Sequence, residues 1–257
     1  MGGTRARNVR PTLARVKHRL WLVARCARRA DMLPIMSSPV LSPSSPLPAT
    51  DASGVRLLHV DEHLIVAEKP AGLLAVPGRG EAGRVNLASH VQARFPDALV
   101  VHRLDMGTSG LMLLARGPEM QRRLNAAFEQ RAVGKRYVAV VEGVVQGDEG
   151  RIAAPLAADW PNRPRQIVDV VNGKPSLSYW QVMARGGATT RLSLSPVTGR
   201  SHQLRVHLQH IGHPIRGDEL YAPLPLNAER LLLHAAEISF AHPGSGLTMH
   251  FLSPSPF

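Results

Sequence analysis

From Val55 onward, apolar and polar residues follow one another in short runs that are typical of strands joined by tight turns. Residues 55–70 place two apolar runs on either side of an Asp-Glu-His turn, which predicts a β-hairpin. Further strands are predicted for residues 111–115, 135–143, 166–171, 176–183, 190–196, 231–243 and 247–254. Many strands in succession with few helices between them indicate an α+β domain whose sheet is largely antiparallel.

Three segments have apolar residues at helical spacing. Residues 84–95 form the first and end before a proline. Residues 118–132 form an amphipathic second segment that begins at Pro118, a residue favoured in the first helical turn. Residues 200–212 form the third, with Gly212 as the predicted C-terminal cap.

The composition changes before residue 55. Residues 37–54 are rich in Ser and Pro, which predicts a linker or a disordered segment. Residues 1–30 hold nine Lys or Arg residues and no acidic residue. Of the formal charge of +12 (31 basic, 19 acidic), residues 31–257 therefore carry 22 − 19 = +3. Because the excess charge lies mainly in the first 30 residues, it is weak evidence that the folded body binds nucleic acid.

The basic segment has three interpretations. It fits an RNA-binding arm, because like-charged runs attract phosphate. It also fits a targeting peptide, although it is poor in serine. Translation that starts at Met32 or Met36 would remove it altogether. We predict that residues 1–54 form an extension, disordered or a start-site artefact, and that residues 55–257 form the folded domain.

Several functional classes are disfavoured. A single cysteine, Cys26, excludes an internal disulfide and cysteine-based metal sites, and fits a reducing cytoplasm. No apolar run is long enough for a membrane span. The glycine-rich residues 72–83 lack the spacing of a nucleotide-binding loop. His207 and His210 lie three residues apart without further ligands, so they fit surface or RNA-facing residues better than a metal site.

Residues 101–115 combine a charged loop with an apolar run. Judged alone, this loop is either a polar turn or an active site. Arg103 and Asp105 could simply form an ion pair, but an exposed pair stabilises a protein by under about 1 kcal/mol and does not distinguish the two interpretations. The sequence near Asp105 lacks the second carboxylate of a glycosidase and the Gly-x-Ser-x-Gly motif of serine hydrolases. Asp105 remains as a lone candidate group.

Five segments, in order, resemble the RluA-type family of pseudouridine synthases. They are EKPAGLLAVPG (68–78), VHRLDMGTSGLMLLAR (101–116), KRYVAVVEG (135–143), PVTGRSHQLRVHLQHIGHPIRGDELYA (196–222) and RLLLHAAEISFAHP (230–243). The block H-R-L-D-x-x-T-S-G followed by G-R-x-H-Q-x-R-x-H is specific, and His102 distinguishes this branch from RsuA-type enzymes. The resemblance extends from about residue 55 to the end of the chain.

The resemblance implies a pseudouridine synthase fold: a mainly antiparallel, bent mixed sheet flanked by helices, with an active-site cleft across it. It also implies isomerisation of uridine in structured RNA by breaking the N1–C1′ bond and rejoining the base through C5. Short members without an S4 domain, as expected here, are implied to modify position 746 in a 23S rRNA hairpin and position 32 of tRNA anticodon loops. No cofactor, metal, DNA or membrane is implied, and we expect a cytoplasmic monomer. The alternative is an RNA-binding or ribosome-assembly protein in which catalysis is dispensable.

The family's catalytic residues match three positions. Asp105 matches the catalytic aspartate, and Arg205 is implied to pair with it and to favour its charged form. Tyr137 matches the active-site tyrosine, suited to general-base work or to stacking on the base. Whether the aspartate adds to C1′ or removes the 2′ hydrogen to form a glycal stays open.

The target uridine is expected to leave its stack to reach Asp105, and Arg103 is implied to enter the vacated space. The other predicted RNA contacts are His102, Arg79, Arg163, Arg165, Arg200 and His202.

Overall fold

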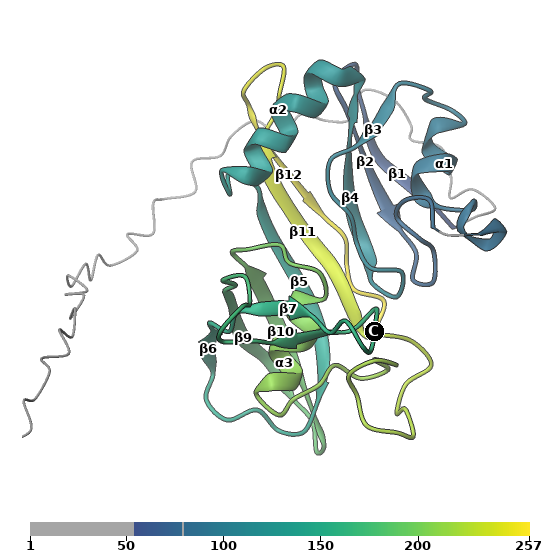
Figure 1. The fold of residues 1–257 in the computed structure, drawn as a ribbon. Helices are drawn as coiled ribbons and strands as arrows, with labels where there is room; N and C mark the ends of the chain where they lie inside the picture. The colour runs from purple at the N-terminus through teal and green to yellow at the C-terminus, as the bar shows by residue number, and fades with distance from the viewer. Residues whose placement is uncertain (1–53, 79) are drawn as a thin grey trace, which may run out of the picture. The chain divides into compact units, whose positions relative to one another are not determined.

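The computed structural model describes residues 54–78 and 80–257, so predictions for residues 1–53 and for Arg79 lie outside it. Ten strands form one sheet in the order β1-β2-β4-β11-β5-β10-β9-β6, with β12 paired to β11 and β3 paired to β4 (Figure 1). The strands of this sheet are β1 Arg56–Val60, β2 Leu64–Lys69, β3 Ala98–Val100, β4 Ser109–Arg116, β5 Gly134–Glu142, β6 Glu149–Ile152, β9 Ser178–Arg185, β10 Thr189–Pro196, β11 Leu233–Ala241 and β12 Thr248–Leu252. β7 Leu156–Ala158 and β8 Gln166–Val168 form a separate hairpin.

The predicted α+β class with a largely antiparallel sheet is confirmed. Within the described residues, β4 and β11 form the one parallel strand pair, with His234 opposite Ser109. Gly110 makes this pairing possible, because its φ is +113° and a Cβ atom there would lie 2.3 Å from the carbonyl oxygen of Ala235. The close approach brings the loop that precedes β4 next to β11.

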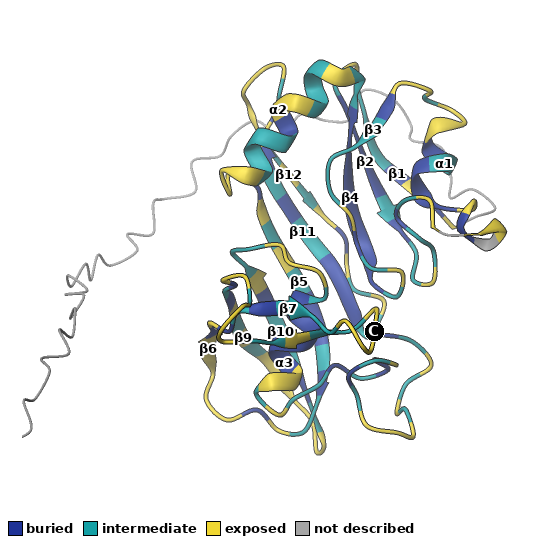
Figure 2. Cartoon of the chain, in the orientation of Figure 1, coloured by how far each residue is buried: buried dark blue, intermediate teal, exposed yellow. Residues whose placement is uncertain are grey.

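β4 is buried on both faces, as its dark colour shows (Figure 2). Leu111 and Leu113 pack in one cluster with α2, Gly117–Glu129, while Met112 and Leu114 pack in another with α1, Leu87–Gln92. Because alternate residues of a strand point to opposite faces, burial of both faces explains the continuous apolar run.

The third predicted helix begins later than its spacing indicated. α3 spans Gln203–His210, and His202 before it has a φ of +53°, in the left-handed region. Its apolar residues Leu204 and Leu208 pack on β5 and β10. The sharp turn at His202 places that side chain and Arg205 at the same end of the helix.

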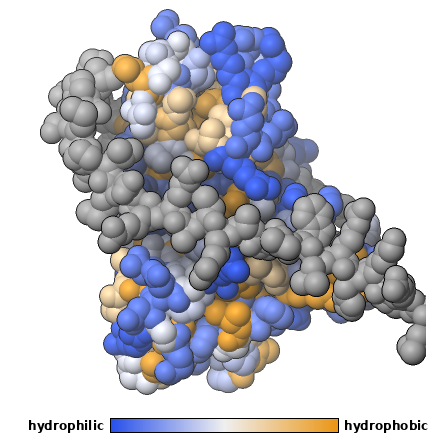
Figure 3. Space-filling view, turned by 90° about the vertical axis from the view of Figure 1, so that its left-hand side faces the viewer, coloured by the Kyte–Doolittle hydropathy of each residue, from blue (hydrophilic) through white to orange (hydrophobic). Residues whose placement is uncertain are grey.

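Three short strands, β3, β6 and β7, were not predicted, and neither was a 3₁₀ turn over Glu81–Gly83. Each of these elements has three or four residues, too few for an alternating pattern, and each of the three strands forms only by pairing with another strand. No helix within residues 54–78 and 80–257 is long and apolar enough to cross a membrane. In Figure 3 hydrophilic residues gather at both ends of the visible described surface, with smaller groups of hydrophobic residues between them.

Candidate active site

Asp105 lies in the loop that connects β3 to β4. The loop is held at two points: the Thr108 amide donates to the Asp105 carbonyl at 3.1 Å, and the Gly72 amide donates to the Met106 carbonyl at 2.9 Å. The Asp105 side chain is 21% exposed, so its carboxylate is partly open to solvent. These two hydrogen bonds therefore fix the backbone on which the Asp105 carboxylate is placed.

Arg205 is shared by two carboxylates. Its Nε and Nη2 atoms donate to Asp218, both at 2.7 Å, while Nη1 donates to Asp105 at 3.3 Å. Burial disfavours the charged guanidinium, but the hydrogen bonds and charge of Asp218, together with the charge of Asp105, outweigh this and raise the pKa of Arg205. A permanent buried cation is therefore aimed at Asp105, and the predicted pairing of Arg205 with Asp105 is present.

Asp218 was not predicted as a partner of Arg205, although it belongs to the RGDELYA segment. It is 1% exposed, and its carboxylate also accepts the amide of Leu220 at 3.0 Å. Gly217 before it has a φ of +70°, and a Cβ atom there would lie 1.9 Å from the Arg230 carbonyl oxygen. Only the fold shows that this segment lies across from α3, so no local signal marked Asp218 as the partner of Arg205.

His202 is oriented by a chain of hydrogen bonds. The Gln166 amide donates to Tyr221 Oη at 2.7 Å, and Tyr221 Oη lies 2.7 Å from His202 Nδ1. Oη keeps its own proton for donation to Nδ1, and in that arrangement the His202 proton is on Nε2. Nε2 faces Asp105 at 3.9 Å. Burial lowers the pKa of His202 despite the opposing charge of Asp105, so a neutral N–H points at the carboxylate.

Tyr137 lies on β5 beside Asp105. Both line a cavity of about 110 Å³, together with Arg103 and Arg205. Burial, and secondly the negative charge of Asp105, raises the pKa of Tyr137. The phenol therefore stays protonated at neutral pH, which favours contact with a base over general-base work as a phenolate.

A larger cleft of about 600 Å³ opens on the other side of Asp105. Residues 71–78, 103–107 and 217–220 line it, with Pro164 and Arg230 from two other segments. Clefts of 300–1,000 Å³ commonly hold small molecules, so this one has room for a nucleoside. Asp105 and Arg205 line both cavities and form the wall between them.

The predicted RNA contacts have different surroundings. Arg103 is exposed and lines both cavities next to Asp105. Arg200 is exposed at the edge of the smaller cavity. Arg163 is exposed with its guanidinium 3.5 Å from the centre of the Trp160 ring, and Arg165 lies 5.5 Å from the centre of the Tyr221 ring. The structure thus brings Arg103, Arg200 and His202 together around the smaller cavity, while Arg165 lies over Tyr221.

His102 differs from the others. Its Nε2 accepts the Leu113 amide at 2.9 Å, and its ring packs 4.7 Å from that of Phe128. Burial, with a smaller contribution from the charge of Lys135, lowers the pKa of His102 to about 3. His102 is thus a neutral, half-buried acceptor that holds the loop against β4, and its contact with RNA stays a prediction.

His207 is an interior residue and not a surface or RNA-facing one. It is 0% exposed, and its ring nitrogens lie 3.0 Å from Ser178 Oγ and from the Ala154 carbonyl. No group of three His, Cys, Asp or Glu side chains in residues 54–78 and 80–257 is arranged to hold a metal ion.

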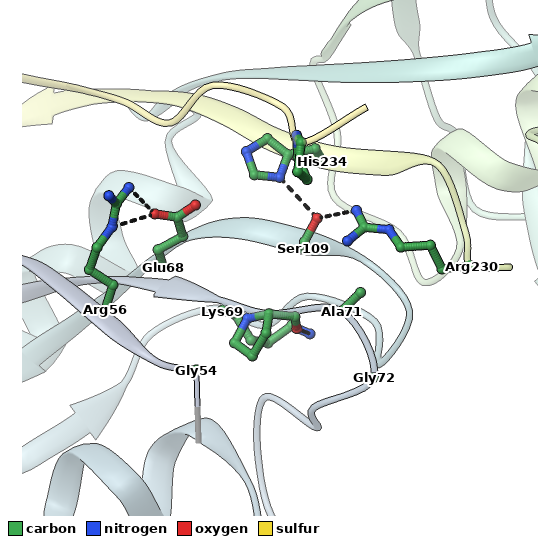
Figure 4. Close-up of a pocket in the computed structure, with 11 residues that line it drawn as sticks. Gly54, Arg56, Glu68, Lys69, Ala71, Gly72, Ser109, Arg230 and His234 are labelled. Atoms are coloured by element: carbon green, nitrogen blue, oxygen red, sulfur yellow. Dashed lines mark hydrogen bonds and ion pairs between the residues drawn. The ribbon is translucent and has the colours of Figure 1, made fainter. Parts of the chain in front are cut away.

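A further cavity of about 620 Å³ is lined by the end of β2 and by the starts of β4 and β11 (Figure 4). Arg230 Nη2 donates to Ser109 Oγ at 2.8 Å, and Ser109 Oγ lies 2.9 Å from His234 Nδ1. His234 Nε2 in turn contacts Ser253 Oγ at 2.9 Å, and Ser253 donates to Glu68 at 2.8 Å. This chain of polar contacts ties the start of β4 to β11, to the C-terminal residues and to β2.

Lys69 is fully buried and contacts the loop that carries Asp105. Its Nζ donates to the carbonyls of Pro70, Leu73 and Met106 at 2.8, 2.7 and 3.0 Å. Burial lowers the pKa of Lys69 from 10.5 to about 7, opposed by the charge of Asp105. Lys69 therefore joins two loops of the cleft, one of which carries Asp105.

We expect Lys69→Met to change how stability depends on pH. Between pH 7 and 10.5 the unfolded chain binds the Lys69 proton more tightly than the folded protein, so this lysine makes wild-type stability rise with pH. Urea unfolding should show that the free energy of unfolding of wild type increases relative to Lys69→Met across this window. The exposed Lys174→Met is the control and should track wild type. A constant difference between wild type and Lys69→Met would contradict the prediction.

Comparisons with known proteins agree with this site. A family model described as RNA pseudouridylate synthase matches residues 63–210. A protein of Vibrio cholerae named dual-specificity RNA pseudouridine synthase RluA is 47% identical over 79% of this chain and 84% of its own. The protein of the same name from Escherichia coli K12 is 44% identical over 78% of this chain and 93% of its own.

A solved structure titled human RNA pseudouridylate synthase domain containing 1 has the same fold. Its TM-score is 0.69 at 24% identity, covering 82% of this chain and 87% of that one. The family model matches from residue 63 to the end of α3, and within this range lie Asp105 and the buried Arg205 that pairs with it. The chain therefore belongs to the RluA-type family of RNA pseudouridine synthases, isomerases that act on uridine in RNA.

Proposed function

We propose that Asp105 is the catalytic residue and that the substrates are a 23S rRNA hairpin, at position 746, and tRNA anticodon loops, at position 32. The observation that carries the first part is the pairing of a partly exposed Asp105 with the buried Arg205 at the wall of a nucleoside-sized cleft. The name "dual-specificity" of relatives 44–47% identical supports two kinds of RNA substrate.

Breaking the glycosidic bond places positive charge on the ribose and negative charge on the uracil. A carboxylate next to C1′ stabilises that cation, adds to it, or removes the 2′ hydrogen. Each of these roles needs an ionised Asp105. Arg205 favours the ionised form, and it remains in place because Asp218 holds its other edge.

Tyr137 and His202 complete the surroundings of Asp105. Protonated Tyr137 fits contact with the face of the detached uracil while it turns and rejoins through C5. His202 directs an N–H at the carboxylate and restricts its orientation. We assign His202 as a residue that positions Asp105. This role is additional to the RNA contact expected from its motif.

Arg103 is well placed to stabilise an extruded uridine, because it is exposed and lines both cavities beside Asp105. We expect Arg103→Ala to lower kcat/KM by about 10-fold on a structured hairpin and by less on an unstructured oligonucleotide, where extrusion is cheaper. Single-turnover assays on both RNAs measure this difference, with the exposed Arg151→Ala as a charge-matched control. Equal losses on the two substrates would argue for a general phosphate contact instead.

The direct test of the function is to incubate the protein with 23S rRNA and tRNA transcripts. Pseudouridine is then mapped by carbodiimide-dependent primer stops and by mass spectrometry. Product at one site in each RNA is expected. If folded protein forms no pseudouridine in either RNA, the proposed substrates are wrong.

We further propose a cytoplasmic monomer that acts on RNA and not on DNA, with residues 55–257 as the catalytic domain. The support is the single cysteine, the continuous sheet from β1 to β12 and the word RNA in the names of the relatives.

A further inference from the structure

The β7–β8 hairpin projects a short loop at the edge of the cleft. Leu156 and Val168, on one face of the hairpin, pack with Val206 of α3 and with Tyr221. This packing anchors the two strands and leaves the connecting residues 159–165 at the surface. Residue 160 in this loop is a tryptophan.

Trp160 is 69% exposed, while the guanidinium of Arg163 lies 3.5 Å from the centre of its ring. A large aromatic ring in water is unfavourable by the hydrophobic effect, and the packing of the fold does not require it to be there. A guanidinium over an aromatic ring is a cation–π contact of about 0.5–1 kcal/mol at an exposed site. The pair forms a flat, cationic and partly apolar surface.

The loop is held in shape by its own hydrogen bonds. The Asp159 amide donates to the Arg165 carbonyl at 3.0 Å, and the Arg165 amide donates to the Asn162 carbonyl at 3.0 Å. Asn162 Nδ2 also donates to the Asp159 carboxylate at 3.0 Å. Trp160 is therefore presented by a closed turn, and a ligand would not have to order it first.

The position of the loop relative to Asp105 limits what Trp160 can touch. Pro164 lines the 600 Å³ cleft that contains Asp105, and the Gln166 amide binds Tyr221, the residue that orients His202. Trp160 and Arg163 are not among the residues that line this cleft or the smaller cavity. They lie at the rim, outside the space for the target uridine.

We propose that Trp160 and Arg163 form a stacking site for an unpaired nucleobase next to the target uridine in the RNA loop. This proposal rests on the proposed function. Single-stranded RNA is recognised by stacking of splayed bases on aromatic rings and guanidinium planes, and such contacts are sequence-tolerant. The cations of Arg163 and Arg165 favour a phosphate chain over an apolar peptide as the occupant.

Trp160→Ala should raise KM for a hairpin substrate by about 5- to 50-fold and leave kcat within about 2-fold, because stacking precedes the chemical step. Trp160→Phe, which keeps an aromatic face, should recover most of the affinity. Tyr179→Ala is the matched control: Tyr179 is 45% exposed on β9 and lines a different cavity, with Arg136 and Arg151. An unchanged KM for Trp160→Ala, or equal effects of Trp160→Ala and Tyr179→Ala, would overturn the proposal.

Fluorescence gives a readout that does not depend on turnover. The chain has three tryptophans, so Trp21→Phe combined with Trp180→Phe leaves Trp160 as the sole emitter. Binding of a hairpin loop should quench its emission, and a fully paired duplex should quench it much less. If wild type forms pseudouridine but neither RNA quenches Trp160, the stacking site is wrong and the proposed function stands. If hairpin-specific quenching occurs without pseudouridine formation on any RNA, the stacking site stands and the proposed function fails.

Discussion

Asp105→Asn is expected to reduce the rate of pseudouridine formation by at least about 1,000-fold while the affinity for RNA stays within a few-fold of wild type. Asparagine has nearly the same shape as aspartate but no charge, so it can neither stabilise the ribose cation nor act as a base. The fold should tolerate the change, because Arg205 keeps its two bonds to the buried Asp218.

Single-turnover release of the C5 hydrogen from labelled uridine measures the chemical step, and filter binding measures the affinity. Asp148→Asn is the control for loss of one acidic charge, since Asp148 is 89% exposed and paired with Arg185. Turnover by Asp105→Asn within about 10-fold of wild type would remove Asp105 from the catalytic role. Full rescue of a deletion strain by Asp105→Ala would instead favour a protein whose catalysis is dispensable.

Asp218→Ala is expected to lower the free energy of unfolding by about 3–5 kcal/mol, which is a large part of the stability of a typical domain. The substitution leaves the Arg205 guanidinium, 8% exposed, with a single partner at 3.3 Å. A buried charge that has lost its partner destabilises the folded state more than the intact buried ion pair does. Urea unfolding measures the loss.

Asp218→Asn keeps the size of the side chain and tests the role of Asp218 if the alanine variant does not fold. We expect kcat to fall by about 10- to 100-fold, because the guanidinium turns toward its one remaining anion and displaces the carboxylate from the reacting carbon. KM should change little. The exposed Glu129→Gln, at the end of α2 and outside both cavities, is the control and should keep both stability and kcat. Wild-type kcat in Asp218→Asn would show that Asp105 needs no support from this pair.

The pattern of apolar and polar residues was sufficient to predict the elements that have a long apolar run or a single apolar face. The hairpin of β1 and β2, the buried strand β4 and the amphipathic α2 were all predicted, because each carries a periodicity that its own residues define. β3, β6 and β7 have three or four residues and become strands only through pairing with β4, β9 and β8. α3 begins at Gln203 because the backbone at His202 turns into the left-handed region, which the motif does not reveal.

The residues of the candidate site likewise fall into those that the sequence predicted and those that only the structure revealed. Asp105, Tyr137 and Arg205 were identified from motifs, and the structure places all three around one cavity. Asp218 was missed because its role depends on its hydrogen bonds with Arg205, which lies 13 residues earlier in the chain and is buried on α3. His102 belongs to the same motif as Asp105, yet it faces the interior, because side-chain direction in an irregular loop does not follow a simple alternation.

The sequence by itself determined the family, the class of reaction and the carboxylate that we propose as its centre, because these depend on the order and type of residues in short motifs. Only the tertiary structure decided the surroundings of these groups: which acid anchors Arg205, how far each charged group is buried, and which histidines form hydrogen bonds within the fold. Those properties depend on burial and on distances of a few ångströms between segments far apart in the chain. The same is true of Trp160, since only the folded hairpin shows that this ring is exposed at the rim of the cleft.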